Sequence, residues 1–188
     1  GARGSKLQLV LNSIFHLEAS PGNLSWEQYE RIAADRRVAT AVPIAVGDNY
    51  HGYRLVGVTT NLFEVEYREG KKYAVRDGYL FNPKKKQAVV GSFAADWLKL
   101  KLGDTFHPYH GLIFDENNQH AETYVVSGIM EPSNTPADRV IWIPIAGLQN
   151  MAGHDAETAS DVSAVLVKLR SKRSGMMMNQ EFNLQGDV

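Results

Sequence analysis

The histidines between residues 107 and 120 are the side chains of this sequence whose types and spacing first suggest metal binding. His107 and His110 are three positions apart, and residues at that spacing in a strand point to opposite faces, so these two should not share an ion. His120 and Glu122 would lie on one strand face, near the acidic pair at 115–116. We interpret these groups as exposed hairpin residues that hold at most an adventitious ion, and we expect no functional metal site.

Nucleophilic and phosphate-binding motifs are also missing from the sequence. Ser92 and Ser127 do not lie in a G-x-S-x-G pattern, and Ser92 is better explained as a helix cap. The first six residues lack the G-x-x-x-x-G-K-[ST] spacing of a phosphate loop. The chain has no cysteine, which excludes cysteine nucleophiles, thiolate zinc sites and disulfides. We therefore predict a protein that is not an enzyme and that has no catalytic residues and no cofactor.

Length, charge and hydrophobicity narrow the class of protein further. The chain has 188 residues, of which 44% are hydrophobic, and this is enough for a stable core without cross-links. The net charge is −1 with acidic and basic residues interspersed, which argues against a nucleic-acid surface. No apolar run reaches the roughly 18 residues needed to span a bilayer. Because the chain begins with Gly1 rather than Met, we expect a piece of a longer protein; a complete soluble protein is the alternative.

The N-terminal third of the sequence predicts a β-α-β-β order of elements. Alternating apolar residues over 7–15 predict a half-buried strand. Ser25 and Gln28 form a capping-box pattern, which predicts a helix from 25 to about 37. Strands are then expected at 38–45 and 53–58, joined by a polar, glycine-containing turn at 47–52.

The segment 88–105, AVVGSFAADWLKLKLGDT, predicts a strand, a short helix and the start of another strand. We expect Ser92 to cap this helix and Gly103 to end it in a left-handed conformation. The segment 64–81 shows no clear period and is interpreted as loop-rich. The remaining expected elements are a hairpin of strands 107–114 and 122–130 around a turn at 115–118, and strands 140–145 and 162–169 flanking a short helix at 146–151.

Five blocks of the sequence resemble, in order and spacing, the periplasmic core domain of MacB-type ABC-transporter permeases, a group that includes LolC, LolE and FtsX. The longest block is 88–105; the other four are Val42-Pro43, 53–58 with Leu62-Phe63, 124–130 and 140–145. The resemblance covers nearly the whole chain and implies an α+β fold. In that fold a porter-like subdomain of two β-α-β units, residues 1–79 and 139–188, is interrupted by a smaller β-rich subdomain, residues 80–138.

The resemblance also implies a function. It indicates a noncatalytic extracytoplasmic domain on the periplasmic side of the inner membrane, between the first and second transmembrane helices of a membrane-embedded permease. ATP hydrolysis is then expected on a separate ATPase subunit, and the full transporter could be a dimer. Such a domain would couple ATP-driven motion to substrate export or partner handling. The alternative is a binding or regulatory module that contacts a lipoprotein, an adaptor or a cell-wall hydrolase; a soluble hydrolase would need a convergent site that the sequence does not show.

Partner contacts are expected on the hairpin of the β-rich subdomain, because aromatic residues dominate interface hot spots. The candidate contact residues are Tyr109, Phe114, Asp115 and Asn118. Other residues of the resembling blocks have a different predicted role. The residues expected to be architectural, because they let strands and helices approach closely or turn sharply, are Val56, Gly57, Gly91, Gly103, Asp104, Gly128 and Pro144.

Overall fold

The computed structural model of this protein describes residues 1, 5–17, 20, 22–151 and 161–184. The helices are α1 (Lys6–Ser13), α2 (Trp26–Ala33), α3 (Ser92–Leu98), α4 (Ile145–Gln149) and α5 (Lys172–Met178). The longer strands are β1 (Val38–Tyr50), β2 (Tyr53–Val58), β6 (Gln87–Val90), β9 (Tyr124–Met130), β10 (Ile141–Pro144) and β11 (Ala164–Leu169). The short strands are β3 (Glu66–Arg68), β4 (Lys71–Lys72), β5 (Val75–Gly78), β7 (Thr105–Phe106) and β8 (Tyr109–His110).

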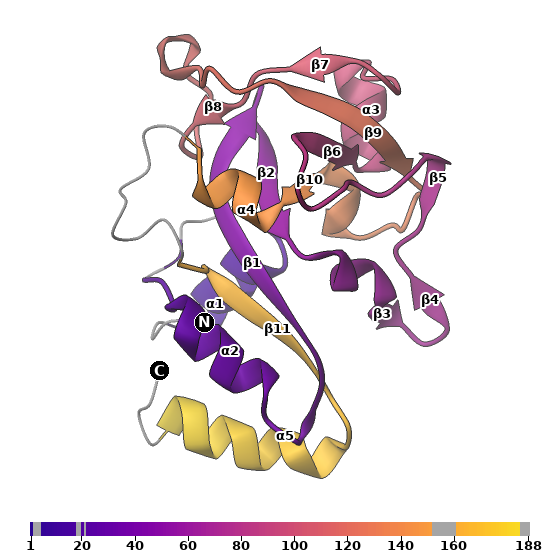
Figure 1. The fold of residues 1–188 in the computed structure, drawn as a ribbon. Helices are drawn as coiled ribbons and strands as arrows, with labels where there is room; N and C mark the ends of the chain where they lie inside the picture. The colour runs from indigo at the N-terminus through magenta and orange to yellow at the C-terminus, as the bar shows by residue number, and fades with distance from the viewer. Residues whose placement is uncertain (2–4, 18–19, 21, 152–160, 185–188) are drawn as a thin grey trace.

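A mixed, nine-stranded sheet organises these elements into the predicted α+β fold (Figure 1). Its strand order is β11-β1-β2-β10-β6-β9-β5, while β7 pairs with β9 and β8 pairs with β1. The predicted strand, helix and strand at the C-terminal side are confirmed as β10, α4 and β11, with β10 parallel to β2 and β11 antiparallel to β1. The segment 64–81, predicted to be loop-rich, contains the three short strands β3, β4 and β5. The division of the chain near residues 80 and 138 into two subdomains stays a prediction.

The strand predicted over 7–15 is wrong, because this segment forms helix α1 instead. Ser5 accepts a hydrogen bond from the backbone N–H of Gln8 at 3.1 Å, and the Gln8 side chain accepts one from the Ser5 N–H at 3.0 Å. The same kind of capping box begins α2, as predicted. The apolar alternation was misleading because it does not mark a buried strand face: Leu7, for example, is 66% exposed.

The hairpin of β1 and β2 is confirmed, but its turn is shorter than predicted. Residues 47–50 continue β1, and the chain reverses at His51 and Gly52, whose φ values of 46° and 84° are both left-handed. The register of β1 against β2 shifts between Val46 and Asp48. Such a bulge changes the direction of the side chains that follow it, and here it precedes an aspartate that is 0% exposed.

The predicted elements of segment 88–105 are confirmed as β6, α3 and β7, with two corrections at the ends of the helix. Gly91, not Ser92, occupies the N-cap position, and no side chain caps α3. Lys99, not Gly103, is the left-handed residue that ends α3, with φ of 57°. Gly103 has a φ of 84° and belongs to the turn before β7.

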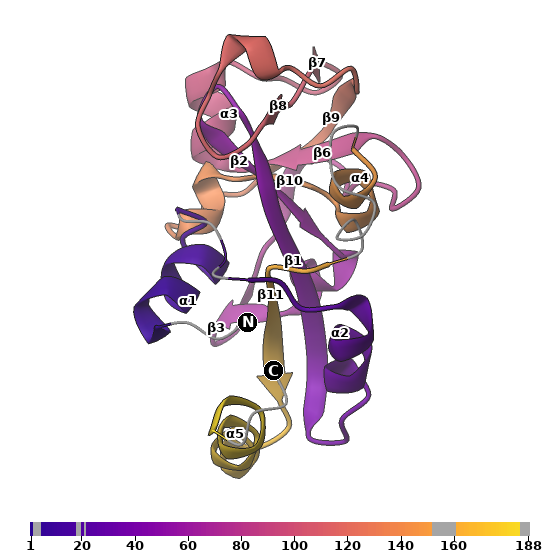
Figure 2. The same ribbon diagram turned by 90° about the vertical axis from the view of Figure 1, so that its left-hand side faces the viewer.

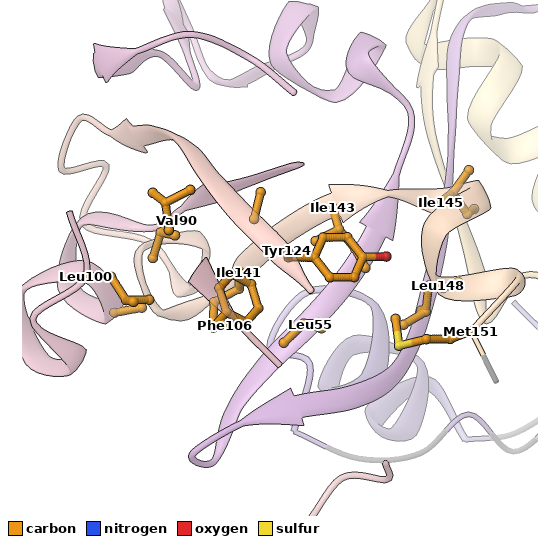
Figure 3. Packing of buried hydrophobic residues seen from close by; sticks show 14 of the residues in the cluster. Leu55, Val90, Leu100, Phe106, Tyr124, Ile141, Ile143, Ile145, Leu148 and Met151 are labelled. Atoms are coloured by element: carbon orange, nitrogen blue, oxygen red, sulfur yellow. The ribbon is translucent and has the colours of Figure 1, made fainter. Parts of the chain in front are cut away.

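Apolar side chains fill both faces of the central strands. One cluster, drawn in part in Figure 3, joins Leu55 of β2 and Ile141 of β10 to Leu148 of α4. The other contains the residues that alternate with them, Val56 and Trp142. Because every residue of β10 is buried, this strand lies between two apolar layers, which is typical of a central strand.

The space around Gly57, Gly91 and Gly128 confirms the close approach predicted for them, whereas an added Cβ at Gly103 would meet no atom within 4 Å and the φ of 84° there fits a sharp turn. A Cβ at Gly91 would lie 2.5 Å from the carbonyl oxygens of Ala137 and Asp138. A Cβ at Gly128 would lie 2.6 Å from the carbonyl oxygen of Tyr79. Gly57 is similarly close to α4, with its added Cβ 3.0 Å from the Cα of Ile145. Backbone therefore packs directly against backbone at these positions, and no larger residue fits without displacement.

Candidate functional site

The molecule has two ends of different character. We call the end that carries β7, β8 and α3 the upper end, as drawn in Figure 1. Helices α2 and α5 lie in the opposite, lower half, where Figure 2 also places Gly1. The segment 107–122, which we call the upper loop, connects β7 to β9 and contains the predicted contact residues.

The chain of the upper loop folds back on itself as predicted, since β7 pairs antiparallel with β9 and Tyr109 forms an antiparallel bridge with Gln119. The predicted strand 107–114 is wrong in its extent, because only β8 is a strand there, and it pairs with β1. The partners of Tyr109 and His110 in this pairing are Asn49 and Asp48. The side chain of Asn49, which is 0% exposed, donates a hydrogen bond to the carbonyl oxygen of Gly111 at 2.9 Å. Asn49 also accepts one from the backbone N–H of Gly52 at 3.0 Å. A buried amide of β1 therefore fastens the loop, and this long-range contact has no local sequence signal.

The four predicted contact residues occupy different environments within the upper loop. Tyr109 is only 9% exposed, and its ring lies 4.7 Å from that of the half-buried Phe114. Asp115 is exposed and accepts a hydrogen bond from the backbone N–H of Asn117 at 3.0 Å, which begins a short 3₁₀ turn. Asn118 is also exposed and donates to Asp115. Their role in partner contact stays a prediction.

The most exposed apolar side chain of the upper loop was not among those candidates. Ile113 is 84% exposed, whereas the aromatic residues beside it pack on His51 and Tyr50. Ile113 stands between Leu112 and Phe114, and such an apolar run gives no sequence signal of exposure, because it would equally fit a buried strand. The upper loop thus has a packed aromatic base and an apolar tip.

A cluster of one aspartate and two histidines lies where the upper loop meets β1. The Oδ1 atom of Asp48 is 3.5 Å from Nδ1 of His110 and 3.4 Å from Nε2 of His120. Asp48 is fully buried, the side chain of His120 is 5% exposed, and that of His110 is 52% exposed. Among the described residues, this is the group of three acidic or histidine side chains close enough to hold a metal ion.

Neighbouring groups orient this cluster. The backbone N–H of Gly111 donates to Oδ1 of Asp48 at 3.3 Å, and Oε2 of Glu122 lies 4.0 Å from Nδ1 of His120. His107 points elsewhere, with its Nδ1 atom 3.1 Å from the carbonyl oxygen of Glu122. Sequence reasoning correctly kept His107 and His110 apart, but it missed Asp48. That residue is 62 positions before His110 and reaches it only through the β1–β8 pairing.

A second surface at the upper end is aromatic. Trp97 on α3 is 70% exposed, and its ring stacks on Phe93 with a centroid separation of 6.1 Å and an interplanar angle of 8°. The guanidinium carbon of Arg139 lies 3.8 Å from the centre of the Phe93 ring, a cation–π contact. Beside it a cavity of about 640 Å³ is lined by residues that include Tyr53, Arg54 and Arg139. An exposed tryptophan held by its neighbours is a typical interface anchor.

Comparisons with known proteins agree with the fold and with the resemblance of the five sequence blocks. The chain matches the MacB-like periplasmic core domain family over residues 4–182. No curated protein matches the sequence. In the described ranges, no helix has the length and apolar character needed to cross a membrane.

Two solved structures share the fold. The periplasmic region of MacB from Actinobacillus actinomycetemcomitans is 14% identical, with a TM-score of 0.58 over 94% of this chain and 87% of that one. The extracellular domain of the noncanonical ABC-type transporter YknZ from Gram-positive bacteria is 18% identical, with a TM-score of 0.56 over 85% of this chain and 80% of that one. With the family match over nearly all of its length, the chain belongs to the MacB-like periplasmic core domain family of ABC-transporter permeases.

Proposed function

We propose that this domain couples ATP-driven motion of a permease's transmembrane helices to substrate export or to the handling of a partner at its upper end. The observation that carries the proposal is the family match over residues 4–182. ABC permeases work with an ATPase, so the domain itself would be noncatalytic and would need no cofactor. A dimeric transporter, and the division into a porter-like subdomain with an inserted subdomain at 80–138, are parts of the same proposal.

The arrangement of the fold supports this coupling. Gly1 and α5 lie in the lower half, and the upper loop lies at the opposite end (Figures 1 and 2). In the proposed orientation the lower half faces the membrane. The sheet joins the two ends because β1 pairs with β11 over Val38–Ile44 and with β8 at Asp48 and Asn49. A displacement of the lower half would therefore be carried to the upper loop through hydrogen-bonded strands.

The exposed apolar groups of the upper end support a partner surface there. Ile113 is 84% exposed and Trp97 is 70% exposed, and large apolar side chains at such exposure are favourable anchors once a partner covers them. A lipoprotein or an adaptor is the proposed class of partner. The binding or regulatory module is the second candidate function, and the same two side chains favour it.

The test uses the absence of cysteine in this chain, which allows single cysteines to be labelled. In the full permease with its ATPase and with the lipoprotein or adaptor fraction added, and with any cysteines outside this chain replaced, Ile113→Cys should react with a membrane-impermeant maleimide at different rates with ATP and with a non-hydrolysable analogue. The reason is that partner coverage of the upper loop would change during the transport cycle. Met176→Cys on α5, exposed to a similar degree at 79%, is the matched control and should change less.

Two results would contradict the coupling proposal. The first is an Ile113→Cys rate that stays constant while the ATPase turns over. The second is an equal change at both positions, which would indicate a movement of the whole domain without a specific event at its upper end.

A further inference from the structure

We propose that Asp48, His110 and His120 form a binding site for a divalent transition-metal ion of the zinc type at the upper end of this domain. The inference is independent of the coupling function, because it rests on the geometry of three side chains from β1 and the upper loop.

The distances between the ligand atoms fit a tetrahedral ion. Zinc binds nitrogen and oxygen ligands at about 2.0–2.2 Å, so two ligand atoms of a tetrahedral site lie about 3.4 Å apart. Oδ1 of Asp48 is 3.5 Å from Nδ1 of His110 and 3.4 Å from Nε2 of His120. All three ligand atoms lie within 4.8 Å of one another. A rotation of the exposed His110 side chain would bring its Nδ1 closer to Nε2 of His120, toward the same tetrahedral separation.

The ligand types select the class of metal. Two imidazoles and one carboxylate suit zinc and its neighbours among the transition metals, whereas magnesium and calcium prefer oxygen ligands throughout. Two histidines and a carboxylate leave a fourth position for water or for a group from a partner.

The groups around the three ligands resemble the outer shell of a metal site. Metal-bound histidines commonly direct their second ring nitrogen at a carboxylate or a carbonyl. Nδ1 of His120 lies 4.0 Å from Oε2 of Glu122, so His120 can present Nε2 to the ion and Nδ1 to Glu122. The Gly111 N–H, at 3.3 Å from Oδ1, holds the Asp48 carboxylate in place.

Burial and access also agree with binding. Asp48 is 0% exposed, and a divalent cation would stabilise a carboxylate in this position, where water does not reach it. His110 is 52% exposed on its side chain, so an ion can enter from solvent by way of this ring. The site thus combines a buried ligand on β1, Asp48, with a solvent-exposed ligand on the upper loop, His110.

The test is calorimetric titration of the metal-free chain with zinc chloride, with magnesium chloride as the competing hard ion. We expect one zinc per chain and no comparable binding of magnesium. His110→Asn should weaken zinc binding by about 100-fold or more, because it removes a ligand, and Glu122→Gln by about tenfold, because it removes an orienting group. His110 is exposed, so this variant should fold, and circular dichroism would verify this.

His51→Asn is the matched control, because it removes an exposed histidine from the same end of the molecule but outside the cluster. It should leave zinc affinity unchanged. As a second readout, zinc should raise the melting temperature of the unaltered chain and of His51→Asn, but not that of His110→Asn. Absence of zinc binding, equal affinity in the unaltered chain and His110→Asn, or an equal loss in the two histidine variants would each overturn the proposal.

Discussion

Two neighbouring regions of the molecule are held together in opposite ways. Where β6 meets α3, Gly91 packs its backbone against the 3₁₀ turn Pro136–Arg139, with no side chain between them. In the upper loop, only the two-residue strand β8 pairs with β1, and polar side chains of β1, above all Asn49, complete the attachment. The first region is fixed by close packing of backbone against backbone, and the second by a two-residue strand pairing and a few polar side chains.

This difference distinguishes the contacts that determine the fold from the contacts that determine the shape of the surface. A larger residue at Gly91 must move the β6–α3 junction away from the 3₁₀ turn that packs on it, whereas a change in the upper loop alters only the loop. The same scaffold can therefore carry different loops, and this is the usual arrangement when binding residues lie on loops that a rigid core positions.

The largest expected effect is that of Gly91→Ala, which disrupts the contact between the β6–α3 junction and the 3₁₀ turn Pro136–Arg139. The new methyl group would lie 2.5 Å from two carbonyl oxygens, and no flexible side chain is available to yield. We expect a loss of about 3 kcal/mol or more in the free energy of unfolding, measured by urea denaturation, or failure to fold.

Gly52→Ala is the matched control for this loss. Its added Cβ would meet no atom within 4 Å, so the only cost is the left-handed backbone with φ of 84°. We expect about 1 kcal/mol there. Equal losses at Gly52 and Gly91 would show that backbone contact is not what fixes the β6–α3 junction.

The pH dependence of stability tests whether the segment after α1, which contains His16, belongs to the core. His16 is 3% exposed, and its ring lies edge-on to Trp142 of β10 at 5.7 Å. Burial, followed by the charge of Arg54, lowers the pKa of His16 to about 4. The folded state therefore favours the neutral ring, and its contribution is complete above the unfolded pKa of about 6.5 and is lost as the pH falls toward 4.

The free energy of unfolding should accordingly fall by about 3 kcal/mol between pH 7 and pH 4 on account of this one group. His16→Asn should reduce that slope, because asparagine tolerates the left-handed φ of 54° and does not titrate. His51→Asn, with the same backbone conformation at an exposed position, is the control. An unchanged slope in His16→Asn would contradict this account.

The smallest expected effect is that of removing the Asn49 side chain, which attaches the upper loop to β1. Asn49→Ala removes the hydrogen bonds to Gly111 and Gly52, and it should cost about 2 kcal/mol. Hydrogen exchange at residues 109–111 should become faster while the exchange of β6 and β10 stays slow. Asn118→Ala, an exposed asparagine of the same loop, should cost less than about 0.5 kcal/mol. Faster exchange throughout the sheet in Asn49→Ala would remove the distinction between the two regions.

Much of the fold could be predicted from the sequence because its signals are local. The capping box at Ser25, the order of elements in 88–105 and the apolar strand at 140–145 are each determined by a few adjacent residues. The helix at Lys6–Ser13 has an equally local capping signal in Ser5 and Gln8, but the apolar alternation over 7–15 is also typical of a strand. Helix α3 shows the limit of such local signals. Ser92 is the expected cap, but the N-cap is Gly91, where the carbonyl groups of Ala137 and Asp138 leave no room for a side chain.

The site was less predictable, because its parts are distant in the sequence. The sequence predicts no functional metal site and pairs His120 with Glu122 rather than with His110, because Asp48 joins the two histidines only through a bulge in β1 and a two-residue pairing with β8. The exposure of Ile113 and Trp97 likewise depends on which elements leave them uncovered. Neither property is encoded within a window of neighbouring residues.

The length of β1 has a mechanical consequence. Its 13 residues span about 40 Å in extended conformation, from the lower half to the base of the upper loop (Figure 1). Hydrogen bonds to β11, β2 and β8 brace it at successive points along this span. If the domain is driven from the membrane side, as proposed, β1 acts as a stiff rod. A tilt imposed at Val38 would then be carried along these paired strands to Asp48 and would displace the loop fastened beside it.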